Sequence, residues 1–474
     1  MSIGLRRPWD AVDFGELARL FPPPPEYFER AWFASPEEID RVKLSRARHR
    51  ADTAGRVPFI RRLWDAAGFD PRDLRDVVDL DRVPTYTVDD LRRSVEEHPP
   101  YGDYQGVSVD DARSEPLRIH LSGGTTGEPR PTLYTQWDRG VSGVLNARGM
   151  YLQGLRPGDV VINSWAYGLH NGAFSFDETL QRWLNCVVIT AGAASGAHKV
   201  VELARRFRAV AVLTTGDYLL RIAEEAEAMG LDLRRDLSIR VLATNVGQEE
   251  RLEELFGVTA LATYGFHEVG TVAVECPQQE GLHIFEDAFH VRVVDVDTGE
   301  QLPDGETGAL VVTEYCKTGS PQFGYNIMDL SFLYPRERCA CGSWLRRMGR
   351  FAGRGDTMVK LRGVNVWPEG IGRVATSVPG TVPDYFVRAV TVDGRDELIV
   401  AVVSDADAGD HADIARTVEE RLRDQLGVRI GVEVVAPGSL DRVTGLDRAT
   451  GQDRAKARRF ADERPPPADP RRGS

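Results

Sequence analysis

A chain of 474 residues is too long for one hydrophobic core, so two or three domains are expected. Its net charge of −13 argues against general nucleic-acid binding, and no apolar run approaches the ~20 residues of a membrane span. Five cysteines without an N-terminal apolar signal segment favour the reducing cytoplasm over a disulfide framework.

The first half of the chain is predicted to alternate helices with strands. Residues 1–40 have an irregular, Pro-rich pattern and are expected to be an N-terminal extension, after which a helical spacing runs from Ile39 to Gly68. Strands are expected at 160–162, 186–190 and 209–214, and helices near 138–153, 172–184, 217–229 and 248–256. This alternation implies parallel sheets with crossover connections.

The second half is predicted to begin with strands and turns and to end in a compact unit. Strands are expected at 291–296 and 309–313, and later at 389–393, 398–403 and 430–435, with a helix at 411–425. Residues 465–474 are rich in Pro, Arg and Gly and are expected to be a disordered tail. The sequence thus predicts an α/β protein with layered sheets, a β-rich subdomain and a small C-terminal α+β domain.

A run of small and hydroxyl-bearing residues is the most informative motif. It follows the strand-like segment 117–121 and consists of Ser122, Gly123, Gly124, Thr125, Thr126 and Gly127. Glycine permits close backbone approach, and successive N–H groups form a nest that binds anions, so the run suits a polyphosphate. A plain Gly-Thr turn is the alternative. No Gly-Lys-Ser/Thr follows, so the run is not a Walker A sequence.

Lysine is rare in this chain. Of 59 basic residues only five are lysines, at positions 43, 199, 317, 360 and 456. Arginine is a fixed planar cation, whereas lysine is a compact charge on a flexible stem. Composition bias gives no reason for these exceptions, and two of them, Lys360 and Lys456, fall inside segments singled out below on other grounds.

Further segments complete the pattern of a nucleotide site. The segment 263–268 follows an apolar strand and ends in a glutamate. The segment 325–330 has an aspartate shortly after a tyrosine. The segment 353–356 stands shortly before a third stretch, at 360–368. With the glycine-rich run, they resemble the ordered motifs of the adenylate-forming superfamily. The chain looks most like the phenylacetate-CoA ligases, over residues 40–464. The closer match is carried by Val83-Pro84 through Arg92, His120, Tyr167-Gly168-Leu169, Gly281–Ile284 with Glu286-Asp287, and Gly363–Pro368.

The resemblance implies an AMP-forming acid–thiol ligase with two half-reactions. A carboxylate and ATP form an acyl-adenylate and pyrophosphate, and CoA then displaces AMP. It also implies a large N-terminal domain at 41–354 and a small mobile C-terminal domain at 355–464, which rotates about a hinge at Asp356. The implied partners are ATP, Mg²⁺, a small carboxylic acid and CoA, with no nucleic acid and no membrane. A homodimer is left open.

The resemblance implies a role for each nucleotide-site residue. The glycine-rich run would hold the triphosphate, with Thr126 among the catalytic groups, and Glu268 would hold Mg²⁺ as a hard oxygen ligand. Tyr264 and Gly265 would flank the adenine, and Asp329 would accept the ribose hydroxyls. The other expected contacts are Thr244 and Asn245 beside the base, His267 in the nucleotide site, Arg354 on the ribose, and Lys456 on the carboxylate oxygen and α-phosphate.

For three of these residues a plain structural role stays open. Glu268 could be a surface carboxylate, and Asp329 could be a loop aspartate that caps a turn. Lys456 could be a solvated lysine in a basic helix, although the scarcity of lysine argues against that reading.

Residues 163–172 are expected to line the organic part of the acid. The pocket residues are Trp165, Tyr167, Gly168, His170 and Asn171. Aromatic surfaces commonly contact flat rings, which favours an aryl acid, and His170 and Asn171 suggest a hydroxyl or amino substituent on that ring. Core packing of Trp165 and Tyr167 is the alternative.

Three cysteines and a histidine form a candidate metal site. Six residues separate Cys276 from His283, and one residue separates Cys339 from Cys341. Coordination by three thiolates and one imidazole suits a structural zinc, and some members of the resembled branch carry zinc in this region. Reduced cysteines that happen to cluster are the alternative.

The chain departs from the resembled pattern at several positions. Glu128 stands where a basic residue is usual, Asn326-Ile327-Met328 lack the usual arginine, and Ala455 replaces a glycine before Lys456. An ATP-dependent aryl-CoA ligase is still the leading hypothesis. An adenylating enzyme that passes the acyl group to a carrier-protein thiol or an amine also fits, as does a non-catalytic module that binds a nucleotide or acyl-adenylate.

Overall fold

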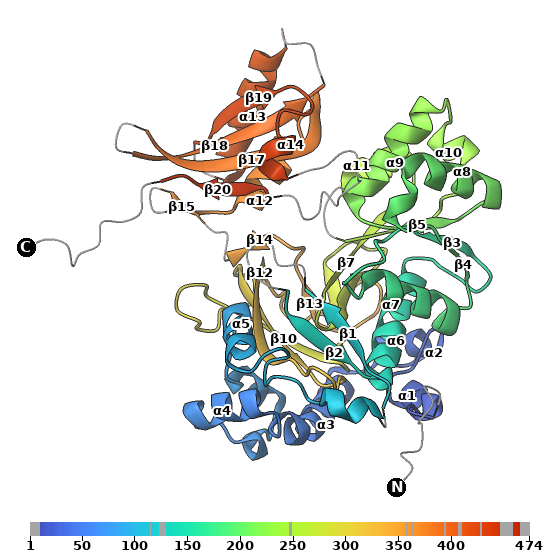
Figure 1. The fold of residues 1–474 in the computed structure, drawn as a ribbon, viewed down its shortest axis with the longest axis vertical. Coiled ribbons are helices and arrows are strands. Elements are labelled where there is room, and N and C mark those ends of the chain that lie inside the picture. The colour runs from blue at the N-terminus through green and yellow to red at the C-terminus, as the bar shows by residue number, and fades with distance from the viewer. Residues whose placement is uncertain are drawn as a thin grey trace, which may run out of the picture. The chain divides into compact units, whose positions relative to one another are not determined.

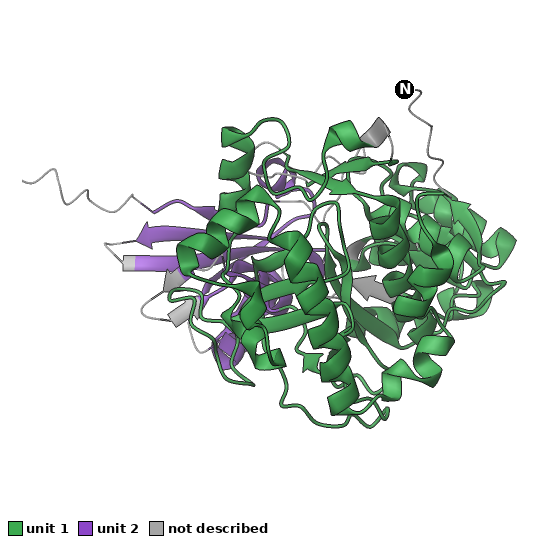
Figure 2. Ribbon diagram, turned by 90° about the horizontal axis from the view of Figure 1, so that it is seen from below, with its two compact units in different colours: residues 1–351 green, residues 352–474 purple. Residues whose placement is uncertain are grey.

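The computed structural model describes residues 10–113, 115–122, 129–245, 249–355, 359–361, 364–392, 395–405, 410–426, 429–445 and 458–464. The chain divides into two compact units, residues 1–351 and 352–474, drawn in green and purple in Figure 2. Each unit has its own hydrophobic core. Among the described helices, none is both long enough and apolar enough to cross a membrane.

Helices form the N-terminal part of the larger unit, where the sequence indicated an irregular extension followed by one helix. They are α1 (Phe14–Leu20), α2 (Glu26–Glu29), α3 (Pro36–Ala54), α4 (Pro58–Ala67) and α5 (Val88–Glu97). Leu17 and Tyr27 are buried, so the N-terminal segment belongs to the core. The predicted helix is interrupted because Pro58 cannot continue α3 and instead begins α4.

A three-stranded parallel sheet, in the green region of Figure 1, has the order β4-β3-β5. Its strands and helices are β3 (Val160–Asn163), β4 (Val187–Thr190), β5 (Ala211–Leu213), α7 (Gly172–Glu178), α8 (Ala197–Phe207), α9 (Gly216–Ala228) and α10 (Leu233–Asp236). The expected alternation of strands and helices is confirmed here. Helix α8 was missed, although its buried Val200, Val201 and Ala204 have helical spacing.

A second sheet has five strands in the order β13-β9-β8-β7-β6. Only β6 and β7 pair in parallel, and α6 packs against β8. The elements are β6 (Leu242–Asn245), β7 (Ala260–Phe266), β8 (Gly270–Glu275), β9 (Leu282–Ile284), β13 (Arg347–Met348), α6 (Gln136–Leu152) and α11 (Glu249–Phe256). The turn between β7 and β8 carries His267 and Glu268.

The predicted β-rich subdomain is an antiparallel arrangement of β10, β11 and β12 in the larger unit. A separate hairpin of β1 and β2 leads into and out of the glycine-rich run. The strands are β1 (Arg118–Leu121), β2 (Pro131–Tyr134), β10 (Phe289–Val294), β11 (Gly308–Glu314) and β12 (Phe323–Ser331).

The smaller unit has a four-stranded sheet in the order β19-β18-β17-β20, with α12 and α13 packed on it. Its elements are β14 (Gly353–Arg354), β15 (Val359–Leu361), β16 (Val364–Val366), α12 (Pro368–Ala375), β17 (Thr381–Val392), β18 (Arg395–Ser404), α13 (His411–Leu426), β19 (Gly431–Val435), α14 (Asp441–Thr444) and β20 (Phe460–Asp462). The predicted α+β character is confirmed, and β17 and β18 are longer than expected because they form one extended hairpin.

Candidate active site

A buried ion pair lies at the turn after β7. Arg130, directly before β2, donates from Nη2 to Glu268 Oε1 over 2.9 Å. Burial alone raises the pKa of Glu268, but the charge of Arg130, together with His267 and the hydrogen bonds to the carboxylate, outweighs burial and lowers the pKa below its usual value. The Glu268 carboxylate is therefore ionised at neutral pH. The alternative of a surface carboxylate does not hold, because Glu268 is only 5% exposed.

A second cation, Lys317, contacts the same turn. Its Nζ donates to the Glu268 carbonyl oxygen and lies 3.6 Å from the centre of the Tyr134 ring. The Tyr134 hydroxyl in turn donates to the His267 carbonyl oxygen over 2.6 Å. Burial lowers the pKa of Lys317, but Tyr134 and nearby carboxylates raise it above its usual value. Sequence reasoning assigned Lys317 no role, and the scarcity of lysine was the one signal available.

Tyr264 and Asp329, both expected to contact adenosine, are neighbours. The Tyr264 hydroxyl donates to Asp329 Oδ2 over 2.9 Å, and both side chains are buried. The contact joins β7 and β12, which belong to different sheets. Asp329 lies within β12, so it is not the turn-capping loop residue of the alternative reading. A Cβ on Gly265 would lie 2.3 Å from the Gly270 carbonyl oxygen, so the close approach of β7 and β8 requires glycine.

The segment expected to line the acyl pocket contains both core and accessible rings. Trp165 packs edge-on against Phe176 at 5.5 Å and belongs to the margin of a core cluster, as the core-packing alternative anticipated. Tyr167 is 38% exposed. Its hydroxyl donates to Asp177 Oδ2 over 2.7 Å and accepts from Asn163 Nδ2 over 3.1 Å, which fixes the ring direction. Tyr167 is thus the accessible aromatic of this segment.

The rest of the segment approaches the Glu268 turn. The His170 ring is 5.9 Å from that of His267 and nearly perpendicular to it. Asn171 is buried directly before α7, and Gly168 is exposed, with no atom of the described residues within 4 Å of an added Cβ. The structure therefore brings the predicted acyl segment and the predicted nucleotide turn together through His170 and His267.

The predicted metal ligands converge. The ligand atoms of Cys276, His283, Cys339 and Cys341 all lie within 4.8 Å of one another. Cys276 Sγ and Cys339 Sγ are 3.8 Å apart, and Cys341 Sγ is 3.5 Å from His283 Nε2. Tetrahedral zinc, with bonds of about 2.3 Å to sulfur and about 2.0 Å to nitrogen, separates its ligands by about 3.8 Å (S···S) and about 3.5 Å (S···N). The donor set and spacing therefore fit zinc.

Several predicted site residues fall outside the described part of the chain. They are Gly123, Gly124, Thr125, Thr126 and Gly127 of the glycine-rich run, with Glu128, the hinge residue Asp356, and Ala455 with Lys456. The backbone of Thr244 and Asn245 ends β6, but their side chains are likewise not described. Ser122 is described, and its hydroxyl accepts from the Arg130 backbone N–H over 3.1 Å. Arg354 lies in β14 of the smaller unit.

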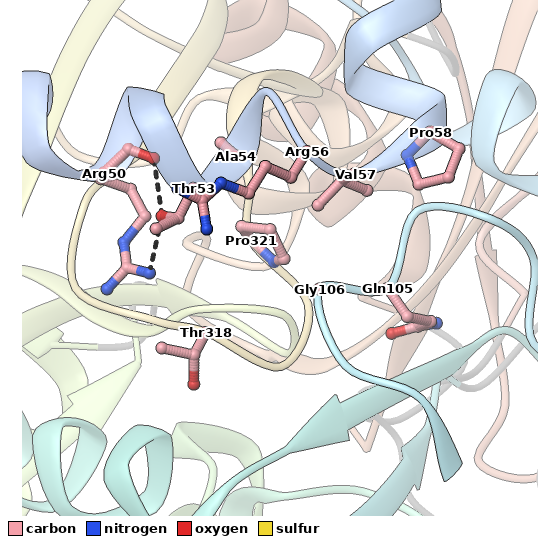
Figure 3. A pocket seen from close by; sticks show the side chains of 10 residues that line it. All are labelled: Arg50, Thr53, Ala54, Arg56, Val57, Pro58, Gln105, Gly106, Thr318 and Pro321. Carbon is pink, nitrogen blue, oxygen red and sulfur yellow. Dashed lines mark hydrogen bonds between the residues drawn. The ribbon is translucent and has the colours of Figure 1, made fainter. Parts of the chain in front are cut away.

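A separate cavity of about 290 Å³ lies between α3, α4 and the loops near residues 105 and 320 (Figure 3). It is lined by Arg50, Thr53, Ala54, Arg56, Val57, Pro58, Gln105, Gly106, Thr318 and Pro321. Arg50 Nη1 donates to Thr53 Oγ1 over 3.2 Å at its edge. Among the described residues of the predicted active site, none lines this cavity.

Curated relatives and a family model identify the family of this chain. Residues 363–464 match the AMP-binding enzyme C-terminal domain. The phenylacetate-coenzyme A ligase of Thermus thermophilus is 34% identical, over 82% of this chain and 90% of its own length. The enzyme of the same name from Aromatoleum evansii is 30% identical over 94% and 98%. The chain belongs to the phenylacetate-CoA ligase family. The predicted membership of the adenylate-forming enzymes and the predicted class, an AMP-forming acid–thiol ligase, are confirmed.

Solved structures support the same fold for this phenylacetate-CoA ligase family member. A 2-hydroxyisobutyryl-CoA ligase in the postadenylation state, in complex with 2-HIB-AMP, is 26% identical with a TM-score of 0.79, over 92% of each chain. The predicted fold class is therefore confirmed.

Proposed function

We propose that this protein activates an aromatic carboxylic acid with ATP and transfers the acyl group to CoA. The relatives named phenylacetate-CoA ligase, matched over more than four-fifths of the chain, carry this proposal. The rings beside the Glu268 turn, including the accessible Tyr167 and its neighbour Phe174 at 5.5 Å, support an aryl rather than a long-chain acid.

The charged side chains at the turn after β7 suit the binding of phosphate groups and Mg²⁺. Glu268 is ionised and buried, which makes it a suitable oxygen ligand for Mg²⁺, and Arg130 and Lys317 place two cations around the same turn. Mg²⁺ would supply charge neutralisation on the phosphates when bound. Tyr264, Gly265 and Asp329 are proposed to contact adenosine, together with Thr244 and Asn245, and the run 122–127 is proposed to hold the triphosphate.

Two residues outside the described ranges complete the proposal. Lys456 is proposed to offset the charge that develops as the carboxylate attacks the α-phosphorus. Asp356 is proposed to be the hinge about which the small C-terminal domain rotates between the two half-reactions. Arg354 is proposed to contact the ribose. Replacing Lys456 by Ala should reduce adenylation by orders of magnitude and affect thioester formation from a supplied acyl-adenylate much less.

The test is ATP–pyrophosphate exchange across a panel of acids. Exchange that depends on benzoic, anthranilic or phenylacetic acid supports the proposal, whereas preference for a long-chain fatty acid overturns the aryl assignment. ATP binding without exchange for any acid would indicate the non-catalytic module. CoA-dependent release of AMP distinguishes CoA from a carrier-protein thiol or an amine as the acceptor.

We further propose a structural zinc at Cys276, His283, Cys339 and Cys341, because four protein ligands leave no open position for a reacting water. All five cysteines are free of disulfides, and Cys186 and Cys316 are buried elsewhere. Reduced cysteines support the proposal of a cytoplasmic location.

A further inference from the structure

The cavity between α3 and α4 combines positive charge with an opening to solvent (Figure 3). Arg50 and Arg56 both line it, and no carboxylate of the described residues does. Ala54 and Val57 are buried in its wall, whereas Arg56 and Pro58 are exposed. A ligand can therefore enter beside the turn that joins the two helices and reach the side chain of Arg50.

Arg50 is a buried cation with too few partners. Only 8% of this residue is exposed. In the described part of the chain its guanidinium has one hydrogen bond, from Nη1 to Thr53 Oγ1 over 3.2 Å, and Nε has no partner. A guanidinium carries five N–H donors, and a buried charge is unfavourable unless it is paired. Figure 3 shows this guanidinium extending from α3 towards the wall that carries Thr318, so its free donors stand at the cavity.

Glu314 does not supply the missing partner. Burial raises the pKa of the Glu314 carboxyl and the charge of Arg50 opposes this, so the two groups lie within electrostatic reach of each other. Both Glu314 oxygens are already hydrogen-bonded, to the backbone N–H groups of Cys316, Lys317 and Gln322 over 2.9, 2.8 and 3.1 Å. Glu314 is buried outside the cavity wall, and with the described residues Arg50 forms no ion pair.

Arg56 adds a second cation at the mouth of the cavity. Its backbone N–H donates to the Thr53 carbonyl oxygen over 3.1 Å, so the last turn of α3 continues to this residue. Side chains three positions apart on a helix are neighbours, which places Arg50, Thr53 and Arg56 along one side of that turn. The Arg56 guanidinium has no ion-pair or hydrogen-bond partner among the residues that the structure describes. Two unpaired cations in one cavity favour a ligand with two negative charges.

We propose that this cavity binds the phosphate group of a small organic phosphate monoester. Such a group carries nearly two negative charges at neutral pH and three acceptor oxygens, and guanidinium groups match its geometry. Arg50 and Arg56 hold the oxygens, while Val57 and Pro58 contact a short apolar body. The volume of about 290 Å³ limits the ligand to a small molecule. The site is separate from the proposed nucleotide and acid sites, and the inference does not depend on the proposed function.

The test is calorimetric binding of butyl phosphate at constant ionic strength. Arg50→Gln and Arg56→Gln should each raise Kd at least ~10-fold, because each removes charge-assisted hydrogen bonds to the phosphate. Arg41→Gln is the matched control, since it removes the same charge from an exposed position of α3 that does not line the cavity, and it should keep the Kd of the natural protein. Phosphate bound by the glycine-rich run would respond to none of the three changes.

Two comparison ligands define the chemical class. Butyrate, which carries one charge, should bind more weakly than butyl phosphate, and uncharged butanol should not bind. Absence of butyl phosphate binding, or a Kd that either arginine variant leaves unchanged, would overturn the inference, and equally tight binding of butyrate would overturn the choice of a phosphate. If Arg50→Gln does not fold, Arg56→Gln, at an exposed residue, decides the test alone. Acid-dependent pyrophosphate exchange, measured separately, bears on the proposed function only.

Discussion

Arg130 Nη2 and Glu268 Oε1 lie 2.9 Å apart although 138 residues separate them in the sequence. The pair links the end of the glycine-rich segment to the turn after β7, and both side chains are largely buried. A buried ion pair is costly to assemble, but removing only one partner leaves a charge without compensation. The pair therefore fixes the position and the ionisation of the carboxylate that is proposed to hold Mg²⁺.

Replacing Arg130 by Met should destabilise the larger unit strongly. The Glu268 carboxylate would stay buried without its partner, and we expect the free energy of unfolding to fall by about 3–5 kcal/mol. The double variant Arg130→Met/Glu268→Gln should recover part of that loss, because the remaining side chain is neutral. Urea unfolding of the two single variants and the double variant measures the coupling.

Arg92→Met is the matched control, because Arg92 forms an exposed pair with Asp89. We expect it to change the free energy of unfolding by less than about 0.5 kcal/mol. Additive losses in the Arg130 and Glu268 double variant would contradict the interpretation that charge burial governs this site.

Gly265→Ala should disturb the β7–β8 hairpin. The added Cβ would meet the Gly270 carbonyl oxygen at 2.3 Å, so the backbone must shift, and we expect a loss of about 1–3 kcal/mol in stability. Because Tyr264 precedes this residue, KM for ATP should rise as well. Gly168→Ala meets no atom within 4 Å and should leave the free energy of unfolding nearly unchanged. Equal stability of the two alanine variants would show that the hairpin adapts at no cost.

Local patterns in the sequence predicted the elements of the fold well where apolar spacing and chain breakers agree. Strand β3 and helices α6, α9 and α13 lie at or close to their predicted positions. The split between α3 and α4 was missed because apolar spacing continues across it, although Pro58 marks the break. Periodicity reports which face of an element is buried and is a weaker guide to where that element ends.

The sequence predicted which residues belong to the candidate site better than it predicted which of them contact one another. The cysteine cluster combines two short segments with an unusual ligand composition, so its members were visible in the sequence and converge in the structure. The partner of Glu268 and the position of Lys317 depend on which strands lie side by side, and no local pattern carries that information. The same holds for His120 and His267, whose pairing follows from the packing of β1 against the turn after β7.

The purified protein should contain one zinc per chain at the cluster of Cys276, His283, Cys339 and Cys341. Removing zinc with a strong chelator should lower Tm, because metal binding to this ligand set contributes directly to folding stability. Cys341→Ala should lose the metal and lower Tm in the same way, as seen by elemental analysis and thermal unfolding.

Cys186→Ala is the matched control for the metal prediction, since Cys186 lies in a different core cluster and its thiol approaches the Arg156 carbonyl oxygen. It should keep its zinc. Natural protein without bound metal, and with a Tm that chelation leaves unchanged, would refute the zinc proposal.

Acidification should destabilise the protein well before most carboxylates are protonated. Burial lowers the pKa of His120, His267 and His290 to about 4 in the folded protein, whereas an unfolded histidine has a pKa of about 6.5. Between these values the unfolded chain binds more protons, so the free energy of unfolding falls as the pH falls. The contribution is fully present above about pH 6.5 and is lost towards pH 4, at up to about 3 kcal/mol for each histidine.

Other buried groups change the size of this effect without reversing it between pH 7 and 5. The lowered pKa values of Glu268 and Glu286 also make the free energy of unfolding fall as the pH falls, but at more acid pH. Burial raises the pKa of Glu314, which makes the free energy of unfolding rise as the pH falls. Urea unfolding at pH 7, 6 and 5 measures the slope. His267→Phe removes one of the titrating rings and should flatten the slope, and the exposed His198→Ala should not. A free energy of unfolding that stays constant from pH 7 to 5 would mean that these histidines have the same pKa in the folded and the unfolded protein, which would contradict this prediction.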